Sequence, residues 1–120
     1  MSVATDQNFN VFRGDDVSPI FTVLDGAGAA IDLSLFLEVQ WLAYFDPVVT
    51  PSVINKKKTT GGVTFVSDGK DGKVQVLLSK TDTTALKMGW MAHSVVVTDG
   101  QGNVTTVALG RFSILDRGIM

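Results

Sequence analysis

His93 is the first residue to consider for chemistry, because the chain has no second histidine and no cysteine. An imidazole can act as a general base. No serine stands in the turn of a nucleophile elbow, however, and a lone histidine without cysteine excludes His-pair and thiolate metal sites. Met91, Val95 and Val97 alternate with His93 and share its face of an expected strand. We therefore expect a partly buried, hydrogen-bonded packing histidine and no enzyme.

Carboxylates offer two further chemistries, glycoside hydrolysis and Ca²⁺ binding. Glu38 is the only glutamate, and most aspartates fall in expected turns, so no carboxylate pair of a glycosidase is evident. Asp68, Asp71 and Asp99 lie in glycine-rich loops and carry oxygens of the kind that Ca²⁺ binds. Their spacing does not match a twelve-residue calcium loop, and aspartate favours such turns by bonding its own backbone. We expect turns here, with no metal and no cofactor.

The tripeptide Arg13-Gly14-Asp15 matches an integrin-binding motif. It stands between two expected strands, where a glycine supplies the turn. So short a motif occurs often by chance, and we interpret it as a turn.

Three consecutive lysines, Lys56, Lys57 and Lys58, contrast with an otherwise acidic chain. Lysines commonly protect a solvated edge strand from pairing with other chains. The same charges could instead bind an acidic partner, a phosphate or lipopolysaccharide. We keep all three lysines as candidate partner-binding residues.

The two tryptophans are expected to differ in their surroundings. Trp41 lies in the most apolar strand and is expected in the core, as a strand-C tryptophan is in immunoglobulin-like sandwiches. Trp90 faces opposite Met91, so we expect Trp90, Leu42 and Tyr44 outside the core. Exposed apolar clusters usually mark contacts with other chains. Subunit contact is our prediction for these three residues; ordinary partial burial and a glycan-binding platform are the alternatives.

Charge and hydropathy exclude several classes of partner. The net charge of −2 and the pI near 5.1 argue against binding to nucleic acid. No apolar run is long enough to span a bilayer, and we expect no signal peptide because the N-terminus lacks a basic region followed by an apolar one. The length of 120 residues suits one domain, with its core at about residues 9–115.

Composition and turn signals indicate an all-β fold. Valine, isoleucine and threonine make up 34 of the 120 residues, and glycine-containing turns separate short apolar runs. Pro19 predicts that its strand is an edge or bulges there. Thr81 or Asp82 is expected to cap a short helix at 81–86. The expected strands are residues 9–13, 17–24, 35–45 (ended by Asp46-Pro47), 53–59, 63–66, 73–79, 91–97 and 104–115, before a frayed tail at 116–120.

Alternation along these strands sorts side chains between two faces. In the strand at 35–45, one face carries Leu37, Val39, Trp41, Ala43 and Phe45, and we expect it to point inward. Val74, Val76 and Leu78, and later Gly110, Phe112 and Ile114, are expected to do the same.

The order of the motifs resembles a known family. The chain opens with Arg13-Gly14-Asp15 after an apolar run, continues with Ile31-Asp32-Leu33-Ser34, and later has Leu78-Ser79-Lys80-Thr81-Asp82-Thr83. This order resembles the immunoglobulin-like domain of tailed-bacteriophage structural proteins, the group that includes the N-terminal domain of baseplate upper proteins. The resemblance covers residues 9–115. Met91 and His93 stand where that family usually has aromatic residues.

The resemblance implies a fold and a role. The fold would be an immunoglobulin-like antiparallel β-sandwich of seven or eight strands. The role would be structural: a virion component of the tail, baseplate or capsid, made in the bacterial host cytoplasm, that docks onto other virion proteins and forms homo-oligomers. A carbohydrate-binding module that recognises the host surface is the alternative function.

Overall fold

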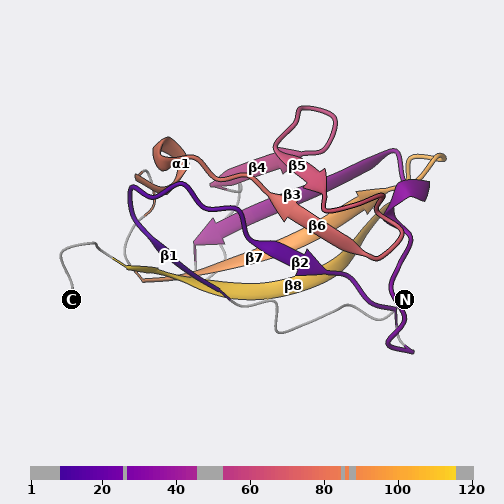
Figure 1. Cartoon of the computed structure of the whole chain (residues 1–120), viewed down its shortest axis with the longest axis horizontal. Coiled ribbons are helices and arrows are strands. Elements are labelled where there is room, and N and C mark those ends of the chain that lie inside the picture. The colour runs from indigo at the N-terminus through magenta and orange to yellow at the C-terminus, as the bar shows by residue number, and fades with distance from the viewer. Residues whose placement is uncertain (1–8, 26, 46–52, 85, 87–88, 116–120) are drawn as a thin grey trace.

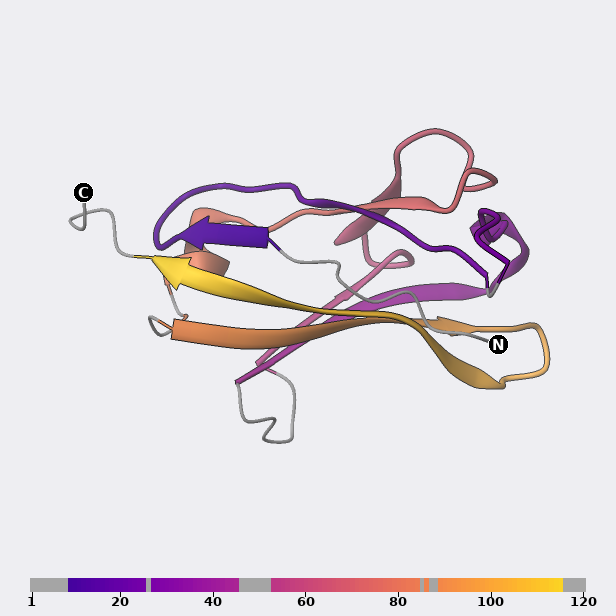
Figure 2. The ribbon, with the colours of Figure 1, turned by 90° about the horizontal axis from the view of Figure 1, so that it is seen from below.

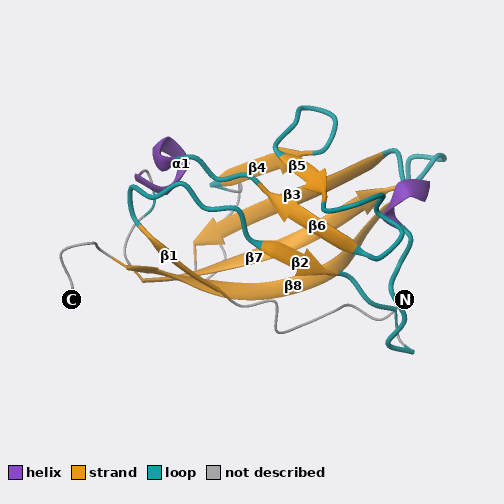
Figure 3. Ribbon diagram, viewed as in Figure 1, coloured by secondary structure: helices purple, strands orange, loops and turns teal. Residues whose placement is uncertain are grey.

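The computed structural model describes residues 9–25, 27–45, 53–84, 86 and 89–115. They form two stacked β-sheets joined by loops, with two short helical segments (Figures 1 and 3). The expected turn at Asp46-Pro47 and the expected frayed tail at 116–120 lie outside the described residues.

Eight strands build the two sheets, which confirms the all-β sandwich predicted from the sequence. The larger sheet has the order β1-β8-β7-β3-β4 and the smaller one the order β2-β6-β5. All pairs are antiparallel except β1 with β8, which run parallel, so the expectation of a wholly antiparallel sandwich is wrong at this edge (Figure 2). The strands are β1 (Phe9–Phe12), β2 (Ile20–Thr22), β3 (Glu38–Phe45), β4 (Ile54–Lys57), β5 (Val63–Phe65), β6 (Lys73–Val76), β7 (Gly89–Thr98) and β8 (Val104–Leu115).

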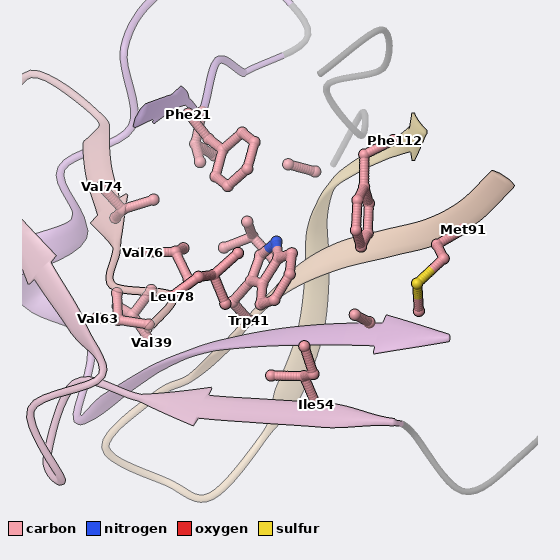
Figure 4. Packing of buried hydrophobic residues seen from close by; sticks show 14 of the residues in the cluster. Phe21, Val39, Trp41, Ile54, Val63, Val74, Val76, Leu78, Met91 and Phe112 are labelled. Atoms are coloured by element: carbon pink, nitrogen blue, oxygen red, sulfur yellow. The ribbon is translucent and has the colours of Figure 1, made fainter. Parts of the chain in front are cut away.

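The core lies between the two sheets and follows the predicted alternation. Val39, Trp41 and Ala43 of β3 are fully buried, and so are Val74 and Val76 of β6. Figure 4 shows Trp41 in the middle of the apolar cluster, between residues of both sheets. Apolar area removed from water at about 25 cal/mol per Å² is the main force that holds the sheets together.

A β-bulge interrupts the alternation on β8. The pairing with β7 shifts between Val95 and Val96, so that one residue of β8, Val107, has no partner of its own. Val107 and Ala108 are consecutive and both fully buried, which fits the two residues of a bulge that stand opposite one residue of the partner strand. The bulge therefore returns the inward set to register for Phe112 and Ile114.

The long apolar strand begins later than expected. A 3₁₀ turn, η1 (Leu33–Leu35), precedes it, and Asp32 caps this turn by accepting a hydrogen bond from the Ser34 N–H. Leu33 takes the buried place, fully shielded from solvent, because the turn changes the direction of the chain. Leu37 was expected inward and is 65% exposed, so that expectation is wrong.

The edges of the sheets agree with the sequence signals. β2 is an edge of the smaller sheet, as Pro19 predicts, and β4 with its lysines is an edge of the larger one. The strand expected at 17–24 is shorter: Val17 and Leu24 form only isolated bridges, to Leu78 and Ala30.

One helix, α1 (Lys80–Thr84), joins β6 to β7 and overlaps the helix expected at 81–86. Its cap is Ser79, two residues before Thr81 and three before Asp82, the two residues predicted for this place. The Ser79 hydroxyl accepts from the Asp82 N–H, and the Asp82 carboxylate accepts from the Ser79 N–H, which is a reciprocal capping arrangement. Among the described residues, no helix has the length and apolar character needed to cross a membrane.

Candidate functional site

The inner side of the larger sheet holds His93 in a packing role. Its side chain is 2% exposed, and the Trp41 indole N–H donates to its Nδ1 over 3.0 Å. The rings of Phe9, Phe21 and Phe112 lie around it, with centroids 4.8 to 5.8 Å away. The prediction of a hydrogen-bonded packing histidine is confirmed, with complete rather than partial burial.

This ring cluster connects the two sheets. Phe21 comes from β2, whereas Trp41 and His93 come from β3 and β7 of the other sheet. In antibody domains a disulfide joins the two sheets and packs on a buried tryptophan. This chain has no cysteine, and here the rings of Phe21 and His93, one from each sheet, lie against Trp41.

The loop aspartates act in their own turns. Asp68 and Asp71 accept hydrogen bonds from the backbone N–H groups of Lys70 and Lys73, and Asp99 accepts from Gln101 and Asn103. The N–H groups of Asn103 and Gln101 hold the pKa of Asp99 below its usual value. The predicted turn chemistry is confirmed. Within the described ranges, no three histidine, aspartate or glutamate side chains gather as a metal site would require.

The Arg13-Gly14-Asp15 turn is fastened to α1. Gly14 has a positive φ of 86°, and its N–H donates to the Thr83 hydroxyl oxygen over 3.0 Å. The same hydroxyl donates to the Asp15 carbonyl over 2.8 Å. Thr83 is fully buried, so the tripeptide is a structural turn, as predicted.

The three lysines do not form one patch. Lys56 reaches Asp82 of α1 at 2.8 Å, and the Lys58 ammonium lies 4.9 Å from the centre of the Phe65 ring. Lys57 pairs with Gln40 and shares its side of the sheet, opposite to that of Lys56. Partner contact through these lysines stays a prediction, with Lys57 the member of the three that faces away from the core.

The ion pair of Lys56 with Asp82 ties β4 to α1. Burial raises the pKa of Asp82, but hydrogen bonds from Lys56 and from the Ser79 N–H outweigh it, so the pKa lies below its usual value. The carboxylate thus stays charged at neutral pH and links an edge strand of the larger sheet to the α1 turn.

The other side of the larger sheet, turned away from the smaller sheet, is here called the outer face (Figure 2). Leu42 and Tyr44 lie on it half-buried, opposite Ser94 and Ala92 of β7, and Trp90 is 57% exposed. Because Trp90 precedes Ala92 by two residues, it is a diagonal neighbour of Tyr44 on this face. The structure therefore places the three predicted apolar residues on one surface.

Other residues of the outer face were not singled out from the sequence. Leu109 of β8 pairs with Ser94 and is 44% exposed, and Phe12 of β1 is 39% exposed. Alternation along β8 and β1 could have placed both residues on the outward side. That they lie on the same face as Trp90 depends on the strand order, which puts β8 between β1 and β7.

A hollow of about 300 Å³ opens beside Trp90 and is lined by Phe9, Asn10, Trp90 and Arg111. We call it the Trp90 hollow. The Arg111 guanidinium carbon lies 5.2 Å from the centre of the Trp90 ring, within reach of a cation–π contact. The Asn10 side-chain oxygen accepts a hydrogen bond from the Ser113 hydroxyl.

The charges of the outer face are few. Among its described residues the cations are Lys57 and Arg111, and the one carboxylate is Glu38. Glu38 accepts hydrogen bonds from the Thr59 N–H and hydroxyl. Burial raises the pKa of Glu38, but these bonds outweigh it and hold the pKa below its usual value. The described part of this face therefore combines apolar side chains, such as Trp90 and Leu109, with polar ones and few charges.

Strand order and the buried strand-C tryptophan together define an immunoglobulin-like β-sandwich. The N-terminal domain of phage TP901-1 ORF48 has a similar structure, with a TM-score of 0.58 and 11% identity over 94% of this chain and 84% of that one. A chicken TCR also has a TM-score of 0.58, with 10% identity over 97% of this chain and 56% of that one. At such identities the likeness shows the fold alone. No family model matches the chain, and the comparison with curated proteins gives no match.

Proposed function

We propose that this chain is a structural component of a tailed-bacteriophage virion that acts by docking onto other virion proteins through its outer face. The order of its motifs resembles that of phage structural domains, and the fold is shared with a phage domain over most of both chains. We propose that the chain is located in the tail or baseplate, or on the capsid.

The observation that carries the proposal is the group of apolar side chains on the outer face. Trp90 is 57% exposed and Leu109 44% exposed, beside half-buried Leu42 and Tyr44. Exposed apolar side chains gathered on one face mark contacts with other chains, and tryptophan, tyrosine and arginine are the side chains that most often dominate such contacts. Because these side chains lie on strands of a folded sandwich, less backbone freedom is lost on binding than for an unfolded segment.

Binding rather than catalysis is part of the proposal. The only histidine is buried among aromatic rings and bonded to Trp41, where it stabilises the core. Assembly into homo-oligomers is also proposed, because symmetric particles hold many copies and multivalent contact strengthens weak docking. Nucleic acid and membrane are not among the proposed partners.

The first experiment asks whether the chain belongs to a particle. Phage particles produced from the genome that encodes it are purified and analysed by quantitative mass spectrometry. We expect peptides of this chain at a fixed ratio to the major structural proteins. Particles that lack the chain, or a gene surrounded by no phage assembly genes, would contradict the proposal.

The second experiment tests the surface. Leu109→Asp places a charge on the outer face, and Ile20→Asp is the matched control because Ile20 is 52% exposed on the other sheet. We expect Leu109→Asp to lower incorporation into particles at least tenfold and Ile20→Asp to leave it within twofold. Equal incorporation of both variants would contradict docking through the outer face.

A carbohydrate-binding module is the second candidate function, favoured by the Trp90 hollow. An exposed indole beside guanidinium and amide groups is a surface on which a sugar ring can stack. Titration with host surface polysaccharide should then give saturable quenching of Trp90 fluorescence. The quenching should be absent in Trp90→Ala.

A further inference from the structure

We propose that the partner of the outer face is a second copy of this chain, and that the two copies pack face to face about a two-fold axis that runs along β7. This inference rests on the proposed docking function and names the partner of that surface.

The strand order decides which strands meet in such a pair. β7 is the middle strand of the larger sheet, with β8 on one side and β3 on the other. A half-turn about an axis that lies along β7, between the two faces, places β8 of one copy over β3 of the other. The rotation leaves the position along the axis unchanged, so residues of β8 and β3 that pair with the same residue of β7 face each other.

At the centre of the face this rotation brings apolar side chains together. Ser94 of β7 pairs with Leu42 of β3 on one side and with Leu109 of β8 on the other. Leu109 of each copy therefore lies over Leu42 of the other. Ser94 is small and only 8% exposed, so the leucines on either side project beyond the middle strand and meet first.

At the next level along β7, aromatic and guanidinium groups meet. Ala92 pairs with both Tyr44 and Arg111. The Arg111 guanidinium, which already lies against the Trp90 ring of its own chain, then faces the Tyr44 ring of the second copy. Guanidinium groups stack favourably on aromatic rings. Trp90 lies at the axis, where the Trp90 hollow, of about 300 Å³, gives space to the indole of the second copy.

The distribution of aromatic residues favours an axis along β7 over an axis across the strands. Trp90 and Tyr44 lie at one end of the outer face, and Thr98 and Glu38 pair at the other end. An axis across the strands would turn one copy end to end and place the aromatic end over the polar pair. An axis along β7 keeps the two aromatic ends together.

The charges of the face are compatible with this arrangement. Lys57 pairs with Gln40, so it is a diagonal neighbour of Glu38, and opposite charges lie side by side at one edge. The two Arg111 side chains lie on opposite sides of the axis, about 10 Å apart across the strands in addition to the distance between the sheets. Repulsion at that separation is largely screened, because the Debye length is about 8 Å at physiological salt.

The area of the face is sufficient for a specific pair. Its strands have 4, 12, 10, 8 and 4 residues in the order of the sheet. Each residue covers about 16 Å² at the usual strand spacing and rise, so the face measures roughly 600 Å². Two copies thus bury roughly 1,200 Å², the lower limit of standard specific interfaces, whereas chance contacts mostly bury less than about 800 Å².

The first experiment measures the oligomeric state of the full chain. Sedimentation equilibrium is recorded from about 1 μM to about 1 mM, which covers moderate to weak affinities. We expect a reversible equilibrium between a monomer of 12.8 kDa and a dimer of twice that mass. In ¹⁵N spectra over the same range the Trp90 indole signal should move, and the Trp41 indole, bonded to His93, should not.

Cysteine cross-linking tests the axis, because the chain has no cysteine of its own. Leu42→Cys and Leu109→Cys are purified separately, mixed, and treated with a short bis-maleimide that reaches between two packed sheets. We expect at least tenfold more cross-linked dimer in the mixture than in either variant alone. Ile20→Cys, exposed on the other sheet, is the matched control and should give only background when mixed with Leu42→Cys.

A charge in the apolar contact tests its contribution. Leu109→Asp should weaken dimerisation at least tenfold, because each carboxylate would lie over Leu42 of the other copy. Ile20→Asp should change it less than twofold. An unchanged Trp41 indole signal in each variant reports that the fold is intact.

Three results would overturn the inference: a monomer at every concentration, a dimer that Leu109→Asp does not weaken, or cross-linking of each cysteine variant with itself rather than with the other. Particle incorporation separates this inference from the proposed function. If the chain is monomeric and Leu109→Asp still blocks incorporation, the outer face docks onto a different virion protein and only the pairing of copies fails. If Leu109→Asp changes neither dimerisation nor incorporation, docking through the outer face fails as well.

Discussion

The two tryptophans lie in the same sheet, but one is buried and the other is exposed. Trp41 on β3 is completely buried and donates its indole N–H to His93 over 3.0 Å. Trp90 on β7 is 57% exposed and lies against Arg111. The same side chain thus stabilises the interior on one side of the larger sheet and offers a contact surface on the other.

This difference shows what a sheet covered on one side does with large side chains. Successive side chains of a strand point to opposite faces, so the position of each tryptophan along its strand decides which face it occupies. The smaller sheet covers only the inner side, where Phe21 reaches the ring cluster around Trp41. The two indoles also differ in their neighbours, because Trp41 donates its N–H to the His93 imidazole and the Trp90 ring lies against the Arg111 guanidinium.

The largest effect expected is that of removing the buried ring. Trp41→Ala should lower the free energy of unfolding by about 3–5 kcal/mol, because it leaves a cavity between the sheets. It also leaves the His93 Nδ1 without its donor. Urea denaturation followed by circular dichroism measures the change, and a cost below about 1 kcal/mol would contradict the central place of Trp41.

His93→Phe tests the hydrogen bond while keeping a ring in the cluster. The buried Trp41 N–H would lose its acceptor, at an expected cost of about 1–3 kcal/mol in the free energy of unfolding. The matched control is Phe112→Leu, which removes a buried ring and leaves the bond of Trp41 to His93 in place. An upfield-shifted, exchange-labile Trp41 indole proton in His93→Phe, with the Phe112→Leu signal unchanged, would confirm the assignment.

A smaller, pH-dependent effect is expected at the ion pair that ties β4 to α1. The folded pKa of Asp82 is lowered, so its contribution to stability is present above the unfolded pKa of about 4 and is lost as pH falls through the folded pKa. Asp82→Asn should cost about 1 kcal/mol or less at pH 6 and less still at pH 3. Equal costs at both pH values, measured by urea denaturation, would show that the charge does not stabilise this contact.

The smallest effect should be that of Trp90→Ala on stability. The exposed ring loses mainly its cation–π contact with Arg111, so we expect about 0.5 kcal/mol. The same variant should lose particle incorporation if the outer face docks. A cost near that of Trp41→Ala would mean that the two tryptophans do not differ as described.

Several local features could be predicted from the sequence. Pro19 and the run of three lysines each predicted an edge strand, and β2 and β4 are edge strands. Alternation placed Val74, Val76 and His93 inside. These predictions were correct because they depend on local features: the missing N–H of proline, the charge of lysine, and the alternation of side chains along a strand.

Other features depended on contacts distant in sequence. One difference is local: Leu37 was expected on the inner side with Trp41 and is 65% exposed, because the capped turn at Leu33–Leu35 puts Leu33 in the core and β3 begins only at Glu38. The lysine run divides because Asp82, twenty-six residues later in the chain, receives Lys56. The Trp90 hollow combines residues from β1, β7 and β8, and no motif within a single strand could indicate it.

The sequence by itself determined the all-β class, the inward and outward sets of most strands and the burial of its only histidine, because these follow from side-chain type and a period of two. The tertiary structure decided which outward residues meet. The order β1-β8-β7-β3-β4 brings Asn10, Arg111 and Trp90 together from both ends of the chain. Strand order is set by packing between segments far apart in sequence, and local patterns contain no information on it.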